Sequence, residues 1–134
     1  MEGDSPESAS TRQAVARAYI DALASHDASA VQFAPGARRV ENGVTTGFSG
    51  PGLKKGLNTA FYYRAIVDIR DIALTEDGDT VHATFVIDAG MFGRKLVTVG
   101  VEESFLIPDG TIHFIRARLS LGSRPRTRSG RKPR

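Results

Sequence analysis

The chain of 134 residues contains no cysteine and no tryptophan, and it has no long apolar run. Without cysteine, neither a disulfide framework nor a thiolate metal site can form. No apolar stretch approaches the roughly 20 residues that cross a bilayer, and the opening MEGDSPESAS lacks the apolar segment of a signal peptide. We therefore expect a soluble, cytoplasmic protein without a membrane span. The length suits a single domain with its own core.

Positive charge is concentrated at the C-terminal end. The chain has a formal charge of +3 at pH 7, yet residues 123–134 (SRPRTRSGRKPR) hold six Lys or Arg and no acid. With two prolines and no apolar side chain, this segment is expected to be disordered. It could bind polyanions non-specifically, but the rest of the chain offers no recognition helix or basic aromatic face for specific nucleic-acid binding. We expect a tail at residues 1–9, a folded domain at 10–122 and a second tail at 123–134.

Deletion of residues 123–134 should leave the melting temperature almost unchanged, because the segment has no apolar side chain that could dock on the domain. Thermal unfolding of the full-length and truncated chains measures this directly. A decrease of several degrees would show that the segment packs against the domain.

The first part of the chain has helical signals. Ser10 and Gln13 are spaced as a capping box, and an apolar stripe follows at helical spacing, which predicts a helix over residues 11–25. A short second helix is expected at residues 28–32, ended by Pro35-Gly36. Asn42-Gly43 predicts a hairpin, because both turn positions need positive φ. The further elements expected here are strands at residues 37–41 and 44–48 and a weak helix at residues 52–57.

After Asn58 the apolar period changes to two, which predicts long strands joined by tight turns. An antiparallel meander that follows helices is typical of the α+β class. A long antiparallel sheet twists and curls around its covering helices, leaving an apolar cavity at its mouth. The strands are expected at residues 61–74, 80–89, 95–107 and 111–121.

Two polar residues interrupt otherwise apolar rows of these strands: Glu103 and His113. A carboxylate in an apolar row is unfavourable unless it is paired or protonated. The alternatives for Glu103 are a bulge that shifts the strand or a partner such as Arg116, and the alternative for His113 is an exposed place at the sheet end. The residues expected to line the cavity are Phe85, Ile87, Val99, Val101, Phe105 and Ile115.

Several kinds of site have no signal in the sequence. No nucleophile–His–Asp triad, HExxH, GxGxxG or P-loop spacing is present, and the three histidines, His26, His82 and His113, fall in separate elements. We therefore expect no metal and no cofactor.

Four segments resemble one superfamily. They are Tyr-Ile-Asp-Ala-Leu at residues 19–23, His26-Asp27, Phe-Ala-Pro-Gly-Ala at residues 33–37, and the stretch from residues 93–95 to 116–117. Together they resemble the nuclear-transport-factor-two-like superfamily, and within it the ketosteroid isomerases and SnoaL-like polyketide cyclases. The resemblance covers residues 11–121. It implies a cone-shaped, cystatin-like α+β barrel with a deep apolar cavity, commonly dimeric through the sheet.

The resemblance to the isomerases also implies a site. It places a tyrosine at Tyr19, a carboxylate base at Glu41, and a protonated acid at Glu103 or Glu102, of which the apolar phase of the strand favours Glu103. The carboxylate would remove a proton next to a carbonyl while two donors stabilise the enolate oxygen. The expected function is cofactor-independent isomerase or cyclase chemistry on a small apolar, steroid- or polyketide-like carbonyl compound.

Two other functions stay open from the sequence. The same cavity could serve an epoxide hydrolase or dehydratase, although related epoxide hydrolases use an Asp–Arg–Asp arrangement that Arg116 and Arg118 cannot supply from the face opposite His113. A non-catalytic ligand-binding or dimerisation module is the other possibility, and in it Glu41 and Glu103 would not converge on the cavity. A homodimer is expected through the outer sheet face, where Ile112 and Phe114 should be exposed.

Overall fold

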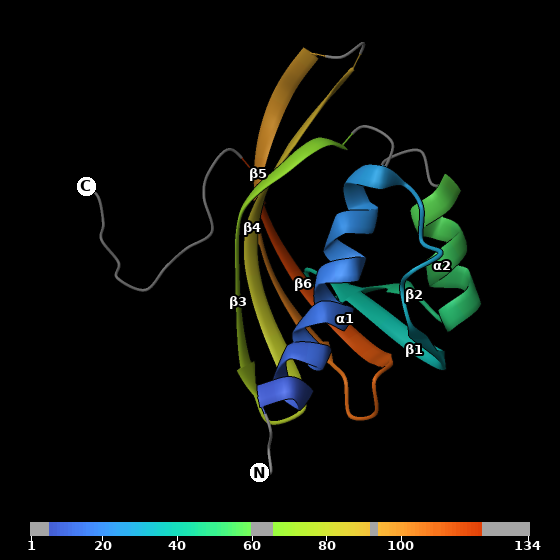
Figure 1. Ribbon diagram of the computed structural model, residues 1–134. Coiled ribbons are helices and arrows are strands. Elements are labelled where there is room, and N and C mark those ends of the chain that lie inside the picture. Colours follow the sequence, from blue (N-terminus) through green and yellow to red (C-terminus); the bar gives the residue numbers. More distant parts are fainter. Residues whose placement is uncertain (1–5, 60–65, 92–93, 122–134) are drawn as a thin grey trace.

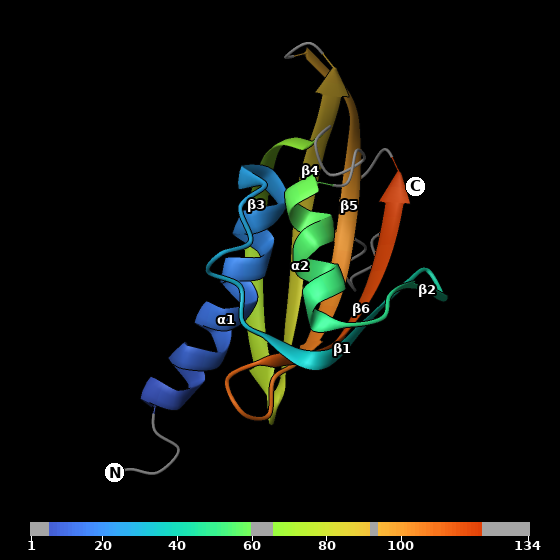
Figure 2. The ribbon, with the colours of Figure 1, turned by 90° about the vertical axis from the view of Figure 1, so that its right-hand side faces the viewer.

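A computed structural model describes residues 6–59, 66–91 and 94–121. Its described part contains two helices and one six-stranded sheet, and both helices lie on the same face of that sheet (Figures 1 and 2). The elements are α1 (Pro6–Ser25), β1 (Phe33–Glu41), β2 (Val44–Gly47), α2 (Gly50–Thr59), β3 (Ile66–Asp77), β4 (Thr80–Met91), β5 (Arg94–Leu106) and β6 (Ile112–Leu121). The predicted α+β class and curved sheet are confirmed. Neither helix is long and apolar enough to span a membrane.

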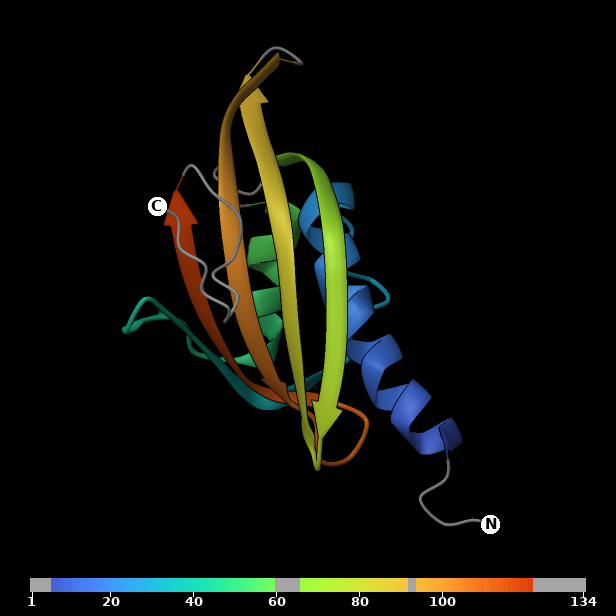
Figure 3. The ribbon, with the colours of Figure 1, turned by 90° about the vertical axis from the view of Figure 1, so that its left-hand side faces the viewer.

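The sheet has the order β2-β1-β6-β5-β4-β3, and it is mixed. Strands β3 to β6 form the predicted antiparallel meander. The expectation of antiparallel pairing holds for the β1–β2 hairpin and for β3 to β6, but β1 and β6 pair in parallel. Turn signals report only pairing between sequence neighbours, whereas β1 and β6 are separated along the chain by β2, α2 and strands β3 to β5. We call the helix-covered side of the sheet the inner face, and the other side, seen in Figure 3, the outer face.

The helices differ in extent from the predictions. Helix α1 begins at Pro6, so Ser10 lies inside the helix and not at its N-cap. Proline is compatible with the first helical turn, where its missing N–H would have no helical partner. Helix α2 is longer than expected, and Ser49 caps it by accepting a hydrogen bond from the Gly52 N–H at 3.0 Å. The start of the strand expected at residue 61 lies outside the described residues.

The short helix expected at residues 28–32 is absent, and a turn stands in its place. Asp27 accepts a hydrogen bond from the Ser29 N–H at 3.0 Å, so it caps a turn and not a helix. The amide of Asn58 accepts a hydrogen bond from the Ala28 N–H at 2.8 Å, which ties this turn to the end of α2. Strand β1 then runs through Pro35-Gly36, which therefore end no helix.

The predicted Asn42-Gly43 hairpin is confirmed, with φ of 48° at Asn42 and 84° at Gly43. This turn is fixed to β6 by two hydrogen bonds. The Asn42 N–H donates to the Ala117 carbonyl at 2.8 Å, and the Asn42 side chain accepts from the Leu119 N–H at 2.9 Å. The last residue of β1, Glu41, is thereby held beside the middle of β6.

The core fills the space between α1 and one end of the inner face. Tyr19 is fully buried, and its ring contacts the Phe105 ring edge-on with centroids 5.3 Å apart. Phe105, Ile115 and Ile112 are all fully buried in the same cluster. The expectation that Ile112 is exposed on the outer face is therefore wrong, whereas Phe114 does lie outward and is half-buried.

Candidate active site

Two glutamates from distant strands share one row across the sheet. Glu41 on β1 is level with Ala117 on β6, and Ala117 is in turn level with Glu103 on β5. Only the small side chain of Ala117 stands between them on the inner face. Neighbouring strands lie about 4.8 Å apart, so the two glutamates are close enough to act on one small molecule.

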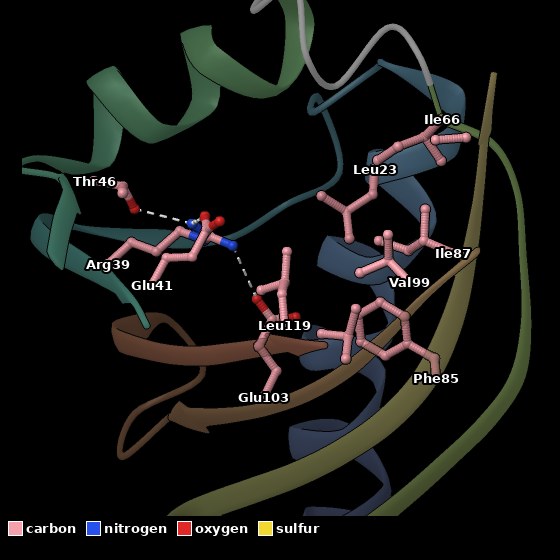
Figure 4. A pocket seen from close by; sticks show the side chains of 12 residues that line it. Leu23, Arg39, Glu41, Thr46, Ile66, Phe85, Ile87, Val99, Glu103 and Leu119 are labelled. Carbon is pink, nitrogen blue, oxygen red and sulfur yellow. Dashed lines mark hydrogen bonds and ion pairs between the residues drawn. The ribbon is translucent and has the colours of Figure 1, made fainter. Parts of the chain in front are cut away.

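Arg39 joins these two glutamates. It lies two residues before Glu41 on β1, so both side chains are on the same face of the strand. Its Nη1 donates to the Glu41 Oε1 at 2.6 Å and to the Thr46 hydroxyl at 2.9 Å, and its Nη2 lies 3.5 Å from the Glu103 Oε2. Figure 4 shows the Arg39 guanidinium next to the Glu41 carboxyl and joined by a dashed line to the Glu103 carboxyl. The side chain of Arg39 is only 6% exposed, compared with 31% for Glu41.

Tyr19 contacts this cluster of Arg39, Glu41 and Glu103 through Arg39. Its hydroxyl accepts a hydrogen bond of 3.0 Å from the Arg39 Nε, and its ring is fully buried between Phe33 and Phe105. Tyr19 is not among the residues that line the pocket described below. The structure therefore brings Tyr19, Glu41 and Glu103 into one cluster, but it is Arg39 and not Tyr19 that presents donors to the pocket.

A pocket of about 420 Å³ opens on the inner face beside this cluster. Arg39, Glu41, Thr46 and Glu103 form its polar end, and aliphatic and aromatic side chains form the rest (Figure 4). Four of the predicted lining residues do line it: Phe85, Ile87, Val99 and Val101. Phe105 and Ile115 do not, because α1 packs directly on them and closes that end of the sheet. The remaining apolar lining residues are Leu23, Ile66, Ala89 and Leu119.

Glu103 is the most unusual group in the pocket. Its side chain is only 1% exposed, and neither carboxyl oxygen has a hydrogen-bond partner among the described residues. Burial raises the pKa of Glu103 to about 7; the nearby Arg39 charge opposes this rise and the Glu41 charge adds to it. At 3.5 Å the contact with Arg39 is an ion pair without good hydrogen-bond geometry. Near neutral pH this carboxyl can therefore both donate and accept a proton.

Glu102 and His113, the two further candidate residues, do not line this pocket. No bulge interrupts β5 between Val97 and Leu106, so Glu102 faces the outer side, level with Arg118, as the strand phase predicts. The His113 side chain is 38% exposed, and its Nε2 lies 3.1 Å from the Asp109 Oδ1 in the preceding turn, which is the exposed place at the sheet end. Arg116, the residue named as an expected partner of Glu103, is exposed on the outer face over the Phe114 ring.

Arg39 was not among the predicted site residues. Its signal was available, because residues 37, 39 and 41 alternate in an expected strand and Arg39 shares a face with the candidate base Glu41. A buried arginine at this spacing indicates a carboxylate partner. Within the part of the chain that the structure describes, no three His, Asp or Glu side chains are grouped as a metal site requires.

Residues 5–119 match the family described as "Domain of unknown function (DUF8021)". The chain belongs to this family. No curated protein sequence matches it.

Solved structures share the fold at low sequence identity. An LEH-like epoxide hydrolase from M. tuberculosis is 17% identical, with a TM-score of 0.64 over 83% of this chain and 84% of that protein. A protein described as a SnoaL-like polyketide cyclase, from Jannaschia sp. CCS1, is 16% identical, with a TM-score of 0.63 over 83% and 86%. A de novo designed protein with a curved β-sheet is 16% identical, with a TM-score of 0.66 over 87% and 88%. The predicted nuclear-transport-factor-two-like, SnoaL-like fold is confirmed, and identities this low establish the fold alone.

Proposed function

We propose that this protein is a cofactor-independent enzyme that transfers protons on a small, largely apolar carbonyl compound of steroid- or polyketide-like character. The observation that carries the proposal is the Glu103 carboxyl, buried without a hydrogen-bond partner at the polar end of an apolar pocket. A buried carboxyl without a hydrogen-bond partner is unfavourable for folding, and its place in the pocket suggests a ligand group as that partner. Its pKa of about 7 suits proton transfer at neutral pH.

The two glutamates would have different roles. Glu41, partly exposed and paired with Arg39, acts as the carboxylate that removes a proton from the carbon next to the carbonyl. Glu103, neutral and buried, donates a hydrogen bond to the carbonyl oxygen as negative charge develops there. Arg39 adds positive charge beside both groups, and Tyr19 holds Arg39 through its Nε. Where the substrate is a β,γ-unsaturated ketone, the enolate is a conjugated dienolate, and return of the proton from Glu41 to its γ-carbon completes an isomerisation.

Exchange of carbon-bound protons in heavy water tests this proposal without knowledge of the natural substrate. Cyclohexanone and decalone would be incubated with the protein in D₂O, and the loss of their α-proton signals followed by NMR. We expect an exchange rate proportional to protein concentration and absent after heat denaturation. Ketones that bind, as seen by saturation-transfer NMR, but do not exchange would contradict the proposal and favour a binding module.

Epoxide opening is a second candidate, and the bridging position of Arg39 favours it. Glu41, Arg39 and Glu103 form a carboxylate–arginine–carboxylate arrangement, which the sequence analysis could not assemble from Arg116 or Arg118. In this reaction Glu103 would protonate the epoxide oxygen as its C–O bond breaks, and Glu41 would take a proton from the attacking water. Incubation of cyclohexene oxide in H₂¹⁸O separates the two reactions, because only epoxide opening places one labelled oxygen in a diol product.

The protein is proposed to form a homodimer through its outer sheet face. Phe114 and Leu106 lie level with each other on that face, and Leu106 is 40% exposed. Apolar side chains next to each other on an open sheet are commonly covered by a second copy. Sedimentation equilibrium at high micromolar concentration should give the dimer mass, and Leu106→Asp should shift the distribution toward monomer. A monomer throughout the concentration series would contradict this proposal.

A further inference from the structure

Along β5, the inward-facing side chains become more exposed to solvent with increasing distance from Glu103. Val101 is only 2% exposed, Val99 is half-buried, and Val97 is 42% exposed. The three valines alternate along one strand, so all of them point to the inner face. The apolar wall that begins at Glu103 thus continues beyond the enclosed part of the pocket.

On strand β6, directly beside β5, side-chain exposure increases in the same way. Ala117 is 3% exposed, Leu119 is half-buried, and Leu121 is 75% exposed. Leu121 is level with Val99 on β5, so the exposed ends of the two rows are adjacent. Strands β4 and β5 extend past the rest of the sheet on this side (Figures 1 and 3). Val97 and Leu121 together form an apolar shelf that continues the pocket, and we call these two residues the shelf.

We propose that the pocket binds an amphipathic molecule longer than its enclosed part, with the polar head at Arg39 and Glu103 and an apolar arm on the shelf. The inference rests on the proposed function only in taking the pocket as a ligand site with its polar end at these residues. Its direct support is continuity: each shelf residue lies two positions beyond a residue that lines the pocket, on the same face of the same strand.

The length of the strands fixes the size of the ligand. From Glu103 to Val97 is six residues, or about 20 Å at the usual strand rise. A ligand with its head at Glu103 must therefore extend well beyond two fused rings to reach the shelf. The head is held by the carboxyl and guanidinium groups, whereas the arm contacts only aliphatic side chains. We therefore expect specificity for the polar head and a graded response to the length of the arm.

Binding of 4-alkylcyclohexanones, with alkyl chains of one to twelve carbons, tests the shelf. Calorimetric titration gives the dissociation constant of each member for the full chain and for Leu121→Asp, Val97→Asp and Val97→Thr. Phe48→Asp is the matched control, because Phe48 is an apolar residue 69% exposed that does not line the pocket. Val97→Thr keeps the β-branched shape of valine, so it should fold even if Val97→Asp does not.

Burial of each methylene contributes about 0.8 kcal/mol, so we expect affinity to rise about fourfold per added carbon as the arm covers the shelf. The shelf variants should bind the longest member at least about tenfold more weakly and the shortest member as the unchanged chain does, and Phe48→Asp should bind all members normally. A length gradient that persists in all three shelf variants, or no gradient at all, would overturn the inference. Proton exchange measured on the same ketones separates the two proposals, because a normal length gradient without exchange contradicts only the proposed reaction.

Discussion

Replacement of Glu41 by glutamine is expected to slow ketone proton exchange by about 10²–10⁴-fold, the usual contribution of a general base. Glutamine keeps the shape of the side chain and can still accept a hydrogen bond from Arg39, but it cannot take a proton. The side chain is 31% exposed at the end of β1, so the fold should tolerate the change. The measurement is the exchange rate at saturating ketone, together with the ketone dissociation constant, which should change little.

The same variant should alter the titration of Glu103. The Glu41 charge is one cause of the raised pKa of Glu103, and the Arg39 charge opposes that rise. Without the Glu41 charge, the pKa of Glu103 should fall, which ¹³C NMR of the labelled carboxyl would detect. Glu102→Gln is the matched control, because Glu102 lies on the outer face of the same strand. Unchanged exchange in Glu41→Gln would remove Glu41 from the mechanism, whatever the titration shows.

Replacement of Glu103 by leucine should increase the stability of the fold at pH 8 and lower the activity. In the folded protein Glu103 keeps its proton up to about pH 7, compared with an ordinary pKa of 4.5 in the unfolded chain. The folded state therefore binds more protons than the unfolded state between these values, so the unfolding free energy of the unchanged chain falls as pH rises through this window. A pKa difference of this size corresponds to about 3 kcal/mol. Leucine does not titrate, so the variant should gain stability relative to the unchanged chain at pH 8.

Urea unfolding at pH 5 and pH 8 measures this difference, and proton exchange measures the activity. Loss of one donor to a developing oxyanion typically costs about 10²–10³ in rate, so Glu103→Leu should be more stable at pH 8 and much less active. Glu102→Leu, on the outer face, should show neither the pH-dependent gain nor the loss of exchange. If the unfolding free energies of Glu103→Leu and the unchanged chain respond equally to pH, then Glu103 does not titrate in this range and the proposed acid is wrong.

The sequence predicted the parts of the site that depend on local periodicity. Alternation in β5 placed Glu103 on the inner face and Glu102 on the outer face, because a strand repeats every two residues and no bulge interrupts this one. Asn42-Gly43 fixed the hairpin that ends β1 at Glu41, because both positions need a positive φ. The apolar stripe predicted the first helix, and Tyr19, which belongs to that stripe, lies in the core.

Only the tertiary structure decided which of these residues meet. The parallel pairing of β1 with β6 places Glu41 and Glu103 on either side of Ala117, and it aligns strands more than 70 residues apart, which no local pattern encodes. The same pairing buries Arg39 between the two carboxyls and uses the Tyr19 hydroxyl to hold it, so the donor at the site is an arginine that the sequence had not singled out. Phe105 and Ile115 share the phase of the lining residues, yet α1 packs on them and they form core. Strand phase determines the face on which a side chain lies, but helix packing and strand order determine whether it meets a pocket, a partner or the core.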